Sequence, residues 1–276
     1  MSYHDRTMLY ISTCLTYPDA PISLLPLAKQ LNQLGIDIVF TPWQQSPHNG
    51  KILPLAAWDY AKFYPEFLQW IEQHATQFIN PAPLMRWNSH KSYLCDLQDW
   101  GVSVIPTQRY SSETLWQADL SVLGKEVVLK PAVGQSGHAV TKIKVGEPLP
   151  DLTVYGDDII VQPFIAEVAS NGETSLIFFK GEFSHAIRRQ PAPNEWRANS
   201  QYKVEISVRE VEDKIIQYAQ SILHKLPQMP VYARVDGTII GDTFLLNELE
   251  LIEPALYLDK VDGAAERFAK IIKQQL

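Results

Sequence analysis

The run Leu245-Leu-Asn-Glu-Leu-Glu-Leu251 ends in alternating acidic and apolar side chains. As a β-strand, its two-residue period places Glu248 and Glu250 on one face and Leu249 and Leu251 on the other. Two carboxylates about 7 Å apart repel each other unless a cation lies between them or solvent screens them. Oxygen ligands without Cys or His favour Mg²⁺ or Mn²⁺. The stretch alone indicates either a metal-binding strand or a solvated strand face.

Asp236, at the end of the preceding predicted strand, is the third candidate metal ligand. A two-residue turn at Gly241-Asp242 would pair Asp236 with Asn247, on the wrong face of the hairpin. A three-residue turn would place Asp236 opposite Leu246 and diagonal to Glu248. The metal interpretation therefore requires the three-residue turn or a β-bulge.

Two apolar strands with unusual ends come earlier in the chain. In Val127-Val-Leu-Lys-Pro-Ala-Val-Gly-Gln-Ser-Gly137, a strand delivers Lys130 and a glycine loop follows. Glycines let backbone N–H groups approach an anion, and the lysine suits a phosphate. An ordinary hairpin with an exposed lysine explains this segment alone at least as well. The strand from Asp158 to Ile165 is broken at Gln162-Pro163. The proline either leaves backbone groups free to bond with a flat ligand or simply ends a buried strand.

A predicted β-hairpin that carries several charged residues follows these strands. If its strands pair across Lys180-Gly181, Arg188 lies opposite Glu173, and Arg189 points away unless a bulge intervenes. Arg197 comes shortly afterwards. Arginines near an acidic metal strand suit a polyanionic substrate, and a structural ion-pair face is the alternative.

Strand and helix signals alternate up to about Asn80, which predicts a small parallel α/β layer. Gly35 is expected to end the first helix. Pro81-Ala-Pro83 interrupts the chain, and the next helix is expected to have Asn88 or Ser89 as its N-cap. The later strands pair through short turns, so the last two-thirds are expected to be antiparallel-rich α+β. Expected helices cover 22–34, 63–78, 88–100, 213–225 and 262–275; expected strands cover 8–12, 36–40, 51–57, 126–130, 158–162, 174–179, 182–188, 231–236 and 243–251.

Composition limits the class of protein. The 276 residues include 31 acidic and 24 basic side chains and have a net charge of −7, which argues against a nucleic-acid-binding surface. P-loop, Rossmann, zincin and hydrolase-elbow motifs are absent. Cys14 and Cys95 form no C-x-x-C motif, and no apolar run approaches the ~20 residues of a membrane span. We expect a soluble cytoplasmic protein without nucleic-acid or membrane partners.

The order of these motifs resembles that of the ATP-grasp superfamily, above all its glutathione-synthetase-like branch. Trp58-Asp-Tyr60, Asn80-Pro81 and Glu248-Leu-Glu-Leu-Ile-Glu-Pro254 are similar to a narrower bacterial subgroup that includes the cyclising ligase of D-cycloserine biosynthesis. The resemblance implies an ATP-grasp fold, α/β plus α+β, with two antiparallel-rich lobes clasping the nucleotide. Its expected parts are an N-terminal parallel α/β (pre-ATP-grasp) domain over 1–87, a small lobe over 88–165 and a large C-terminal lobe over 166–276.

The resemblance also implies how ATP is held. Two lysines would hold its phosphates, and the glycine loop would close over the β- and γ-phosphates. The end of the Asp158 strand would surround adenine, and an acidic residue after it would accept the ribose hydroxyls. In that order, the implied residues are Lys91 and Lys130; Gly134, Ser136 and Gly137; Gln162, Pro163, Phe164 and Ile165; and Glu173.

For the metal and the chemistry, the resemblance implies that Asp236, Glu248 and Glu250 bind Mg²⁺ or Mn²⁺. The arginines facing the transferring phosphoryl group would be Arg234 with Arg188 or Arg197. In the family reaction a carboxylate is activated as an acyl phosphate, and an amine then attacks it. The leading hypothesis is therefore a carboxylate–amine ligase for a small amino-acid-like substrate, possibly a cyclising one. The alternatives are an ATP-grasp kinase that phosphorylates a small acceptor and a nucleotide-binding module without catalysis.

Two departures from the family pattern stand out. Relatives usually carry Asn where Glu250 stands, which leaves the number of metal ions open, and the Gly-Gly that often follows the R-x-N segment is missing after Arg197. Substrate determinants are expected near the carboxyl ends of the N-terminal strands, with Thr13, Asp59 and Tyr60 as candidates. A homodimer is the default oligomeric expectation.

Overall fold

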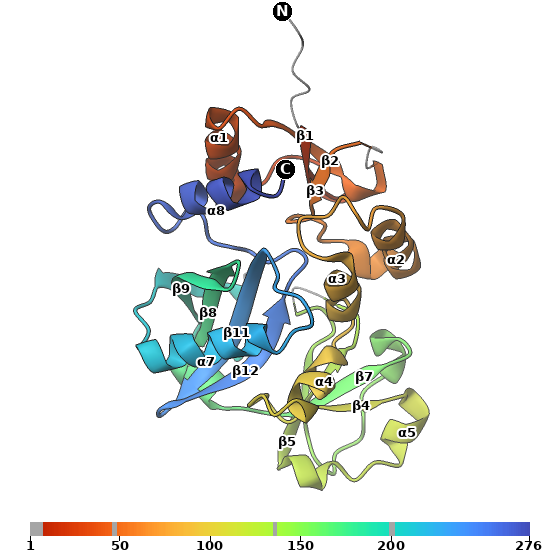
Figure 1. Ribbon diagram of the computed structural model, residues 1–276. Coiled ribbons are helices and arrows are strands. Elements are labelled where there is room, and N and C mark those ends of the chain that lie inside the picture. The colour runs from red at the N-terminus through yellow and green to blue at the C-terminus, as the bar shows by residue number, and fades with distance from the viewer. Residues whose placement is uncertain (1–7, 46–48, 135–136, 199–201) are drawn as a thin grey trace, which may run out of the picture.

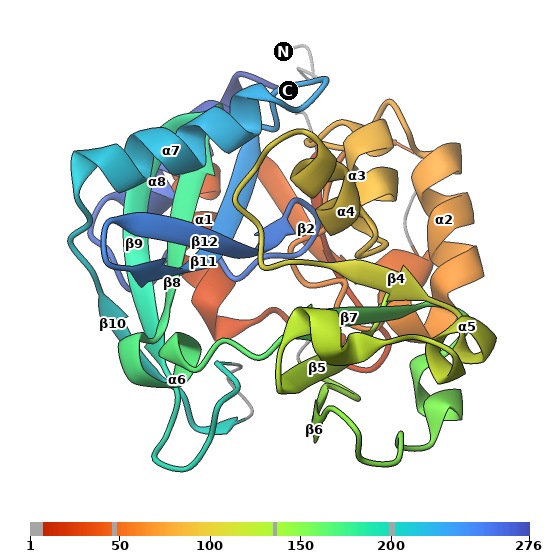
Figure 2. The same cartoon turned by 90° about the horizontal axis from the view of Figure 1, so that it is seen from below.

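Three β-sheets form the framework of the molecule (Figure 1). The computed structural model describes residues 8–45, 49–134, 137–198 and 202–276. A parallel sheet lies at one end, and two antiparallel sheets lie next to each other at the other end, as the view from below shows (Figure 2). The expected order of an α/β layer followed by two antiparallel-rich lobes is confirmed.

The N-terminal sheet is parallel throughout. Its central strand β1 (Met8–Thr13) pairs with β2 (Asp37–Pro42) and with β3 (Lys51–Leu53). The expected third strand, 51–57, is cut short at Pro54, which has no backbone N–H to donate to the sheet. The layer therefore has the predicted topology with a shorter edge strand.

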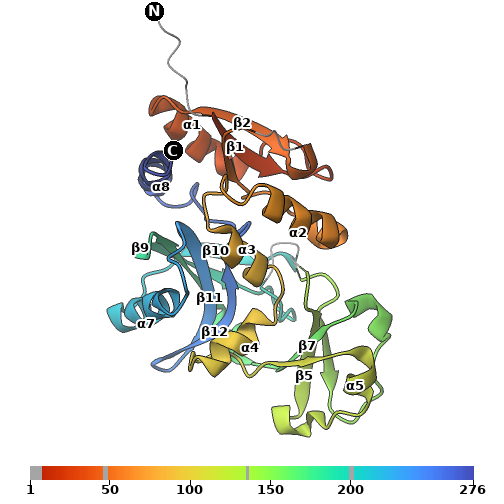
Figure 3. The ribbon, with the colours of Figure 1, turned by 45° about the vertical axis from the view of Figure 1, so that its right-hand side comes forward.

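Helices from both ends of the chain cover this sheet. α1 (Leu25–Gln33) is followed, as predicted, by Gly35 in the left-handed region, with a φ of +78°. α8 (Ala264–Lys273) lies alongside α1 (Figure 3), and its Phe268 shares a core with Leu9 and Leu27. α2 (Tyr64–Gln73) packs against a second cluster of aromatic side chains.

The large antiparallel sheet has five strands in the order β10-β9-β8-β11-β12. One face is mainly apolar and is covered by α7 (Asp213–His224) and α4 (Tyr93–Asp99). The other face carries charged side chains and also apolar ones, such as Ile177 and Phe179, that pack on the N-terminal layer. The strands are β8 (Glu173–Phe179), β9 (Glu182–Gln190), β10 (Glu205–Val208), β11 (Tyr232–Ile240) and β12 (Thr243–Glu250).

The small antiparallel sheet has four strands in the order β4-β7-β5-β6. These are β4 (Gln108–Tyr110), β5 (Glu126–Pro131), β6 (Thr141–Lys144) and β7 (Ile159–Pro163). α5 (Ser112–Trp116) packs on this sheet, and α6 (Glu167–Asn171) leads from it to the large sheet. Short 3₁₀ helices cover Ile22–Leu24, Trp43–Gln45, Tyr60–Phe63, Leu120–Leu123 and Leu152–Tyr155.

The helix expected over 88–100 is shorter than predicted, because only α4 (residues 93–99) lies in this range. A further helix, α3 (Ala82–Asn88), comes before it, where Pro81-Ala-Pro83 was expected to interrupt the chain, and a turn separates the two. Asn88 caps neither helix through its side chain, because that side chain is used elsewhere: Nδ2 donates to the Leu249 carbonyl at 2.7 Å, and Oδ1 accepts from the Leu251 N–H at 2.9 Å. The Asn88 side chain therefore makes a tertiary contact with the end of β12 instead of the helix N-cap that the sequence predicted.

Two helices pack across the domain limits that we expected near residues 88 and 166. α4 belongs to the apolar core of the large sheet, and α8 belongs to that of the N-terminal layer. The limits remain a proposal for where the sheets divide. Among the described residues, no helix has both the length and the apolar character to span a membrane.

Asn80 ties the N-terminal layer to the large sheet. It is fully buried. Its Oδ1 accepts from the N–H groups of Val231 (2.7 Å) and Tyr232 (3.1 Å), and its Nδ2 donates to the carbonyls of Tyr232 (2.9 Å) and Leu251 (2.8 Å). One side chain thus satisfies four backbone groups at the start of β11 and the end of β12.

Replacing Asn80 with Ala should therefore lower the free energy of unfolding by about 2–4 kcal/mol, because buried backbone groups would lose their partners. Urea denaturation followed by circular dichroism measures the change. Asn32→Ala, at an exposed position of α1, is the control and should stay within about 0.5 kcal/mol of the native protein. Equal stability of the two variants would contradict the role given to Asn80.

Candidate active site

Three carboxylates converge on the charged face of the large sheet. Asp236, Glu248 and Glu250 each offer an oxygen atom within 4.8 Å of the others. The turn at Gly241-Asp242 has two residues, and a bulge after Asp236 brings this residue opposite Glu248. The metal interpretation required either a three-residue turn or a β-bulge, and the structure has the bulge.

Two buried arginines neutralise this cluster. Arg234 Nη2 lies 2.8 Å from Asp236 Oδ2 and also contacts Glu250. Arg189 Nη2 lies 2.8 Å from the same Asp236 oxygen and also pairs with Glu173. Burial acts to raise the pKa of Asp236, but the two guanidinium groups outweigh it and the pKa is lowered. Asp236 is therefore held as a carboxylate inside the protein.

Arg189 occupies the place that the sequence gave to Arg188. A bulge between Ile177 and Phe178 shifts the hairpin register, so Glu173 lies opposite Arg189, and Arg188 lies opposite Thr174. The expected pairing of Arg188 with Glu173 is therefore wrong. Arg188 lies on the other face of the sheet, where it donates to the Asn171 carbonyl at 3.0 Å.

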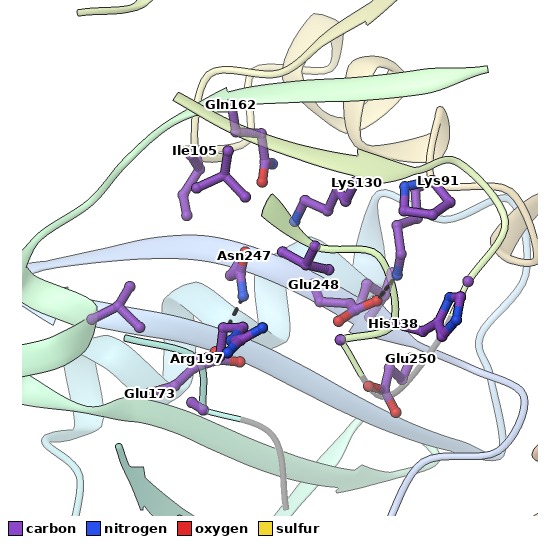
Figure 4. Close-up of a pocket in the computed structure, with 18 of the residues that line it drawn as sticks. Lys91, Ile105, Lys130, His138, Gln162, Glu173, Arg197, Asn247, Glu248 and Glu250 are labelled. Atoms are coloured by element: carbon purple, nitrogen blue, oxygen red, sulfur yellow. Dashed lines mark hydrogen bonds and ion pairs between the residues drawn. The ribbon is translucent and has the colours of Figure 1, made fainter. Parts of the chain in front are cut away.

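Two lysines face the carboxylates from the opposite side of the cavity (Figure 4). Lys91 pairs with Glu248, and its backbone N–H is fixed by the Ala132 carbonyl at 2.7 Å. Burial opposes ionisation of Glu248, but Lys91 and Lys130 lower its pKa. Burial lowers the pKa of Lys130 to about 8, against the smaller effect of Glu248.

The outer edge of β12 explains how Lys91 reaches Glu248. Asn88 bonds to the backbone of β12 on one side of Lys91, and Tyr93 Oη accepts from the Leu249 N–H at 2.9 Å on the other. These two side chains attach the turn between α3 and α4 to the strand that carries the carboxylates. The sequence predicted Lys91 as a site residue. It did not predict the contacts of Asn88 and Tyr93 with β12, because no pattern in the nearby sequence indicates them.

A mainly apolar slot forms the other end of the cavity. Ile105, Val128, Ile165 and Val168 line it, together with Gln162. The Gln162 amide donates to Thr107 Oγ1 at 2.8 Å, so this side chain is fixed by its own lobe. The Phe164 N–H donates to the Glu126 carbonyl at 2.9 Å. A flat ring fits between apolar side chains of this kind.

Glu173 lies on the opposite wall and is nearly fully buried. Besides Arg189, it accepts a hydrogen bond from Asn247 Nδ2 at 3.1 Å (Figure 4). Strand parity should turn Asn247 away from the cavity. The β11–β12 register skips it between Leu246 and Glu248, and it faces the cavity as the extra residue of the bulge.

Arg197 lines the cavity but already has a partner. Its guanidinium forms two 2.9 Å contacts with the carboxylate of Glu195 and lies over the Tyr202 ring. Tyr202 Oη also lies 3.4 Å from the Gly137 carbonyl, which links this segment to the glycine loop.

The structure brings most of the expected residues into one cavity. Ser136 lies outside the described residues. Arg234 and Asp236 are buried and do not line this cavity, although Arg234 contacts Glu250, which does. Arg188 is turned away. The expected residues that line the cavity are Lys91, Lys130, Gly134, Gly137, Gln162, Pro163, Phe164, Ile165, Glu173, Arg197, Glu248 and Glu250.

A second cavity opens from the first towards the N-terminal layer. The two share Arg189, Glu250 and Glu253 among their lining residues, and aromatic side chains such as Trp58 and Tyr257 wall the second one. Burial and the charge of Glu250 raise the pKa of Glu253 to about 8. No cation among the described residues pairs with the Glu253 carboxyl group.

Of the three expected substrate determinants, Asp59 and Tyr60 line different cavities, and Thr13 lines neither. Asp59 lines the second cavity, but it accepts from Trp43 Nε1 at 2.7 Å and from Gln44 and Thr16 at 3.1 Å. Tyr60 lines the first cavity. Thr13 is buried and donates to the Pro18 carbonyl, outside the residues that line either cavity.

The donor set fits a magnesium nucleotide. Lysines and a glycine loop suit phosphates, an apolar slot suits a base, and three carboxylates with oxygen donors suit Mg²⁺. Together with the arrangement of the sheets, this site defines an ATP-grasp ligase, a class that uses ATP with Mg²⁺.

The comparisons identify the family. The model of the prokaryotic glutathione synthetase ATP-grasp domain matches residues 102–256, more than half of the chain, and the chain belongs to this family. The model of the N-terminal domain of D-cycloserine synthetase DcsG matches residues 9–80.

Individual relatives agree with this assignment. The cycloserine biosynthesis protein DcsG of Streptomyces lavendulae is 28% identical over 91% of this chain and 93% of its own length. The crystal structure of D-cycloserine synthetase DcsG has a TM-score of 0.82 at 26% identity and covers 98% of this chain and all of that one. D-alanine–D-alanine ligase from Bacillus anthracis, at 13% identity and a TM-score of 0.68, covers 98% of this chain and 97% of its own and shares the fold.

Proposed function

We propose that this enzyme is an ATP- and Mg²⁺-dependent carboxylate–amine ligase for a small amino-acid-like substrate, and that it closes a ring within one substrate molecule. The observation that carries the proposal is the second cavity, which meets the nucleotide cavity at Arg189, Glu250 and Glu253. Its far wall belongs to the N-terminal layer, the part of the chain that matches the DcsG N-terminal domain. A substrate there would lie beside the transferring phosphoryl group.

Each group in the nucleotide cavity has a role in this proposal. Lys91 and Lys130 hold the phosphates, Gln162 to Ile165 border the base, and Glu173 accepts the ribose hydroxyls. Asp236, Glu248 and Glu250 bind Mg²⁺. The phosphoryl group is faced by Arg189, Arg197 and Arg234, with Arg189 taking the place that the sequence gave to Arg188.

The proposed reaction needs positioning and charge neutralisation rather than a protein nucleophile. ATP is the phosphoryl donor and leaves as ADP, and phosphate is released in the second step. Asp236, Glu248 and Glu250 would hold Mg²⁺, which would neutralise charge on the phosphoryl oxygens. Arg189 and Arg234 orient the substrate carboxylate, whose oxygen takes the phosphoryl group to give an acyl phosphate. The amine then attacks the acyl carbon, the C–O bond to phosphate breaks, and one amine proton leaves. Enclosure between the lobes limits hydrolysis of the activated acyl group.

Glu253 is placed to receive the amine. Its carboxyl group lies where the two cavities meet and has no cationic partner among the described residues. An amino group of the substrate would supply the missing donor and positive charge. The proposal also places the enzyme in the cytoplasm, because the reaction consumes ATP; a homodimer remains a prediction.

The first test is release of ADP in the presence of Mg²⁺ and a panel of amino acids. A ligase should turn over only with substrates that carry both a carboxylate and an amine, and mass spectrometry should show a product that has lost water. Glu248→Gln should lower kcat by at least about 100-fold with the fold intact, because a metal ligand is lost. Sustained phosphorylation of a substrate without an amine would instead indicate the kinase alternative.

The second prediction concerns pH. Because burial lowers the pKa of Lys130 to about 8, nucleotide affinity should be constant below that pH and fall above it, by up to about tenfold per unit, as the lysine loses its charge. Calorimetric titration with a nonhydrolysable ATP analogue measures this. Lys130→Ala should bind about 10- to 100-fold more weakly and lose the pH dependence. Lys29→Ala, on the exposed side of α1, is the control; a native profile in Lys130→Ala would remove this lysine from the site.

The third prediction separates the substrate from the nucleotide. Glu253→Gln should raise the KM of the amine-bearing substrate by about tenfold or more, because a charged hydrogen bond is weakened. The dissociation constant of the ATP analogue should not change. Glu66→Gln, at an exposed position of α2, controls for the loss of one negative charge. An unchanged substrate KM in Glu253→Gln would exclude the proposed contact.

A further inference from the structure

Arg188, which the catalytic cavity does not use, has a second arginine beside it. It lies on β9 opposite Ser207 of β10. Two residues beyond Ser207, Arg209 continues the pairing, since its N–H donates to the Ala186 carbonyl at 2.9 Å. The two-residue period places Ser207 and Arg209 on the same face, so the two arginines are diagonal neighbours across the strand pair. This face is opposite to the one that carries Arg189 and Glu173.

Neither of these arginines has an acidic partner in the described part of the chain. Arg188 donates to the Asn171 carbonyl at 3.0 Å and to Gln190 Oε1 at 2.6 Å. Arg209 donates from Nη1 to Thr174 Oγ1 at 2.8 Å, and no acceptor among the described residues bonds to its Nε or Nη2. Burial first, and then the charge of Arg188, lower the pKa of Arg209, with no carboxylate offsetting them.

The contrast with the other arginines of this sheet is sharp. Arg189 and Arg234 each contact two carboxylates. In a chain where acidic side chains outnumber basic ones by 31 to 24, two adjacent guanidinium groups without a carboxylate leave positive charge uncompensated. An anion bound between the two groups would remove the repulsion between them.

A hollow lies over the two guanidinium groups. Its lining includes Ser170, Asn171, Arg188, Ser207, Arg209 and Glu210, and none of its lining residues belongs to the nucleotide or the second cavity. Glu210 is exposed and forms no ion pair with either arginine. Ser207 adds a hydroxyl group, which can donate a hydrogen bond, to the lining of the hollow.

We propose that this hollow is a second anion site, separate from the active site, that binds a phosphate group. Two guanidinium forks provide several N–H donors and two positive charges, which match the oxygens and the double charge of a phosphate better than the single charge of a carboxylate. The phosphate can be free or part of a small monoester, because the recognised chemistry is the same.

The test uses the full chain with its nucleotide cavity filled by Mg²⁺ and a nonhydrolysable ATP analogue. Inorganic phosphate is titrated calorimetrically at constant ionic strength, and glycerol phosphate serves as the monoester in a parallel titration. One saturable site per chain is expected, and the tighter of the two ligands identifies the source. Absence of saturable binding of both ligands, or binding abolished by the ATP analogue, would overturn the proposal.

Variants locate the site. Arg209→Gln should weaken phosphate binding at least tenfold, whereas Arg267→Gln, an exposed arginine elsewhere on the surface, should bind as the native protein does. Ser207→Glu is an independent variant, because an internal carboxylate between the two arginines should exclude phosphate and raise the melting temperature. Native phosphate affinity in either folded variant of the hollow would show that the anion binds elsewhere.

Discussion

The mutual repulsion of Asp236, Glu248 and Glu250 is the constraint on which the rest of the site depends. Their oxygens lie within 4.8 Å of one another, and at that distance like charges in a poorly solvated cavity are stable only with counter-charges in contact. Arg189 and Arg234 supply these charges from within the sheet, and Lys91 supplies one from the turn between α3 and α4. The Lys91 contact therefore connects the acidic strand with the segment that precedes the small sheet. Under the proposed function, Glu248 would help to hold Mg²⁺ and Lys91 would hold a phosphate, so both members of this pair belong to the nucleotide site.

Most of the fold and much of the site could be predicted from the sequence, because both rest on short-range patterns. The two-residue period identified the strand of Glu248 and Glu250, and glycines marked the turns and the phosphate loop. What the patterns could not supply is a change of register. A bulge after Asp236 and another after Ile177 each shift a strand by one residue, and such a shift turns side chains to the other face of the sheet. Arg189 and Asn247 were missed for this reason. The prediction for Asn88 was wrong for a different reason. Its side-chain amide forms hydrogen bonds with backbone groups at the end of β12, far away in sequence, and no local pattern indicates that contact.

Under the proposed function, different parts of the molecule bind the nucleotide and the substrate. Side chains of the two antiparallel sheets form most of the nucleotide cavity, and solved ligases with only 13% identity share this fold. The second cavity instead takes residues that follow the carboxyl ends of β1 and β3, such as Tyr17 and Trp58. Asn80 keeps this layer in a fixed position relative to β11 and β12. Under the proposed function, side chains of the N-terminal wall can therefore vary with the substrate without a change in the buried ion network.

Glu250 shows how a departure from the family pattern is accommodated. Relatives of the glutathione-synthetase type usually carry a neutral amide here, and the carboxyl group adds a titratable site to an acidic cavity. Burial, reinforced by Glu248 and Asp236 and opposed by Arg234, raises the pKa of Glu250 to about 7, so this residue is poised between its charged and neutral forms. Arg234 contacts both Asp236 and Glu250, so one guanidinium group serves two of the three carboxylates. A cation bound among the three carboxylates would favour the charged form of Glu250, because it would offset the neighbouring negative charges. Cation binding and ionisation of Glu250 are therefore coupled.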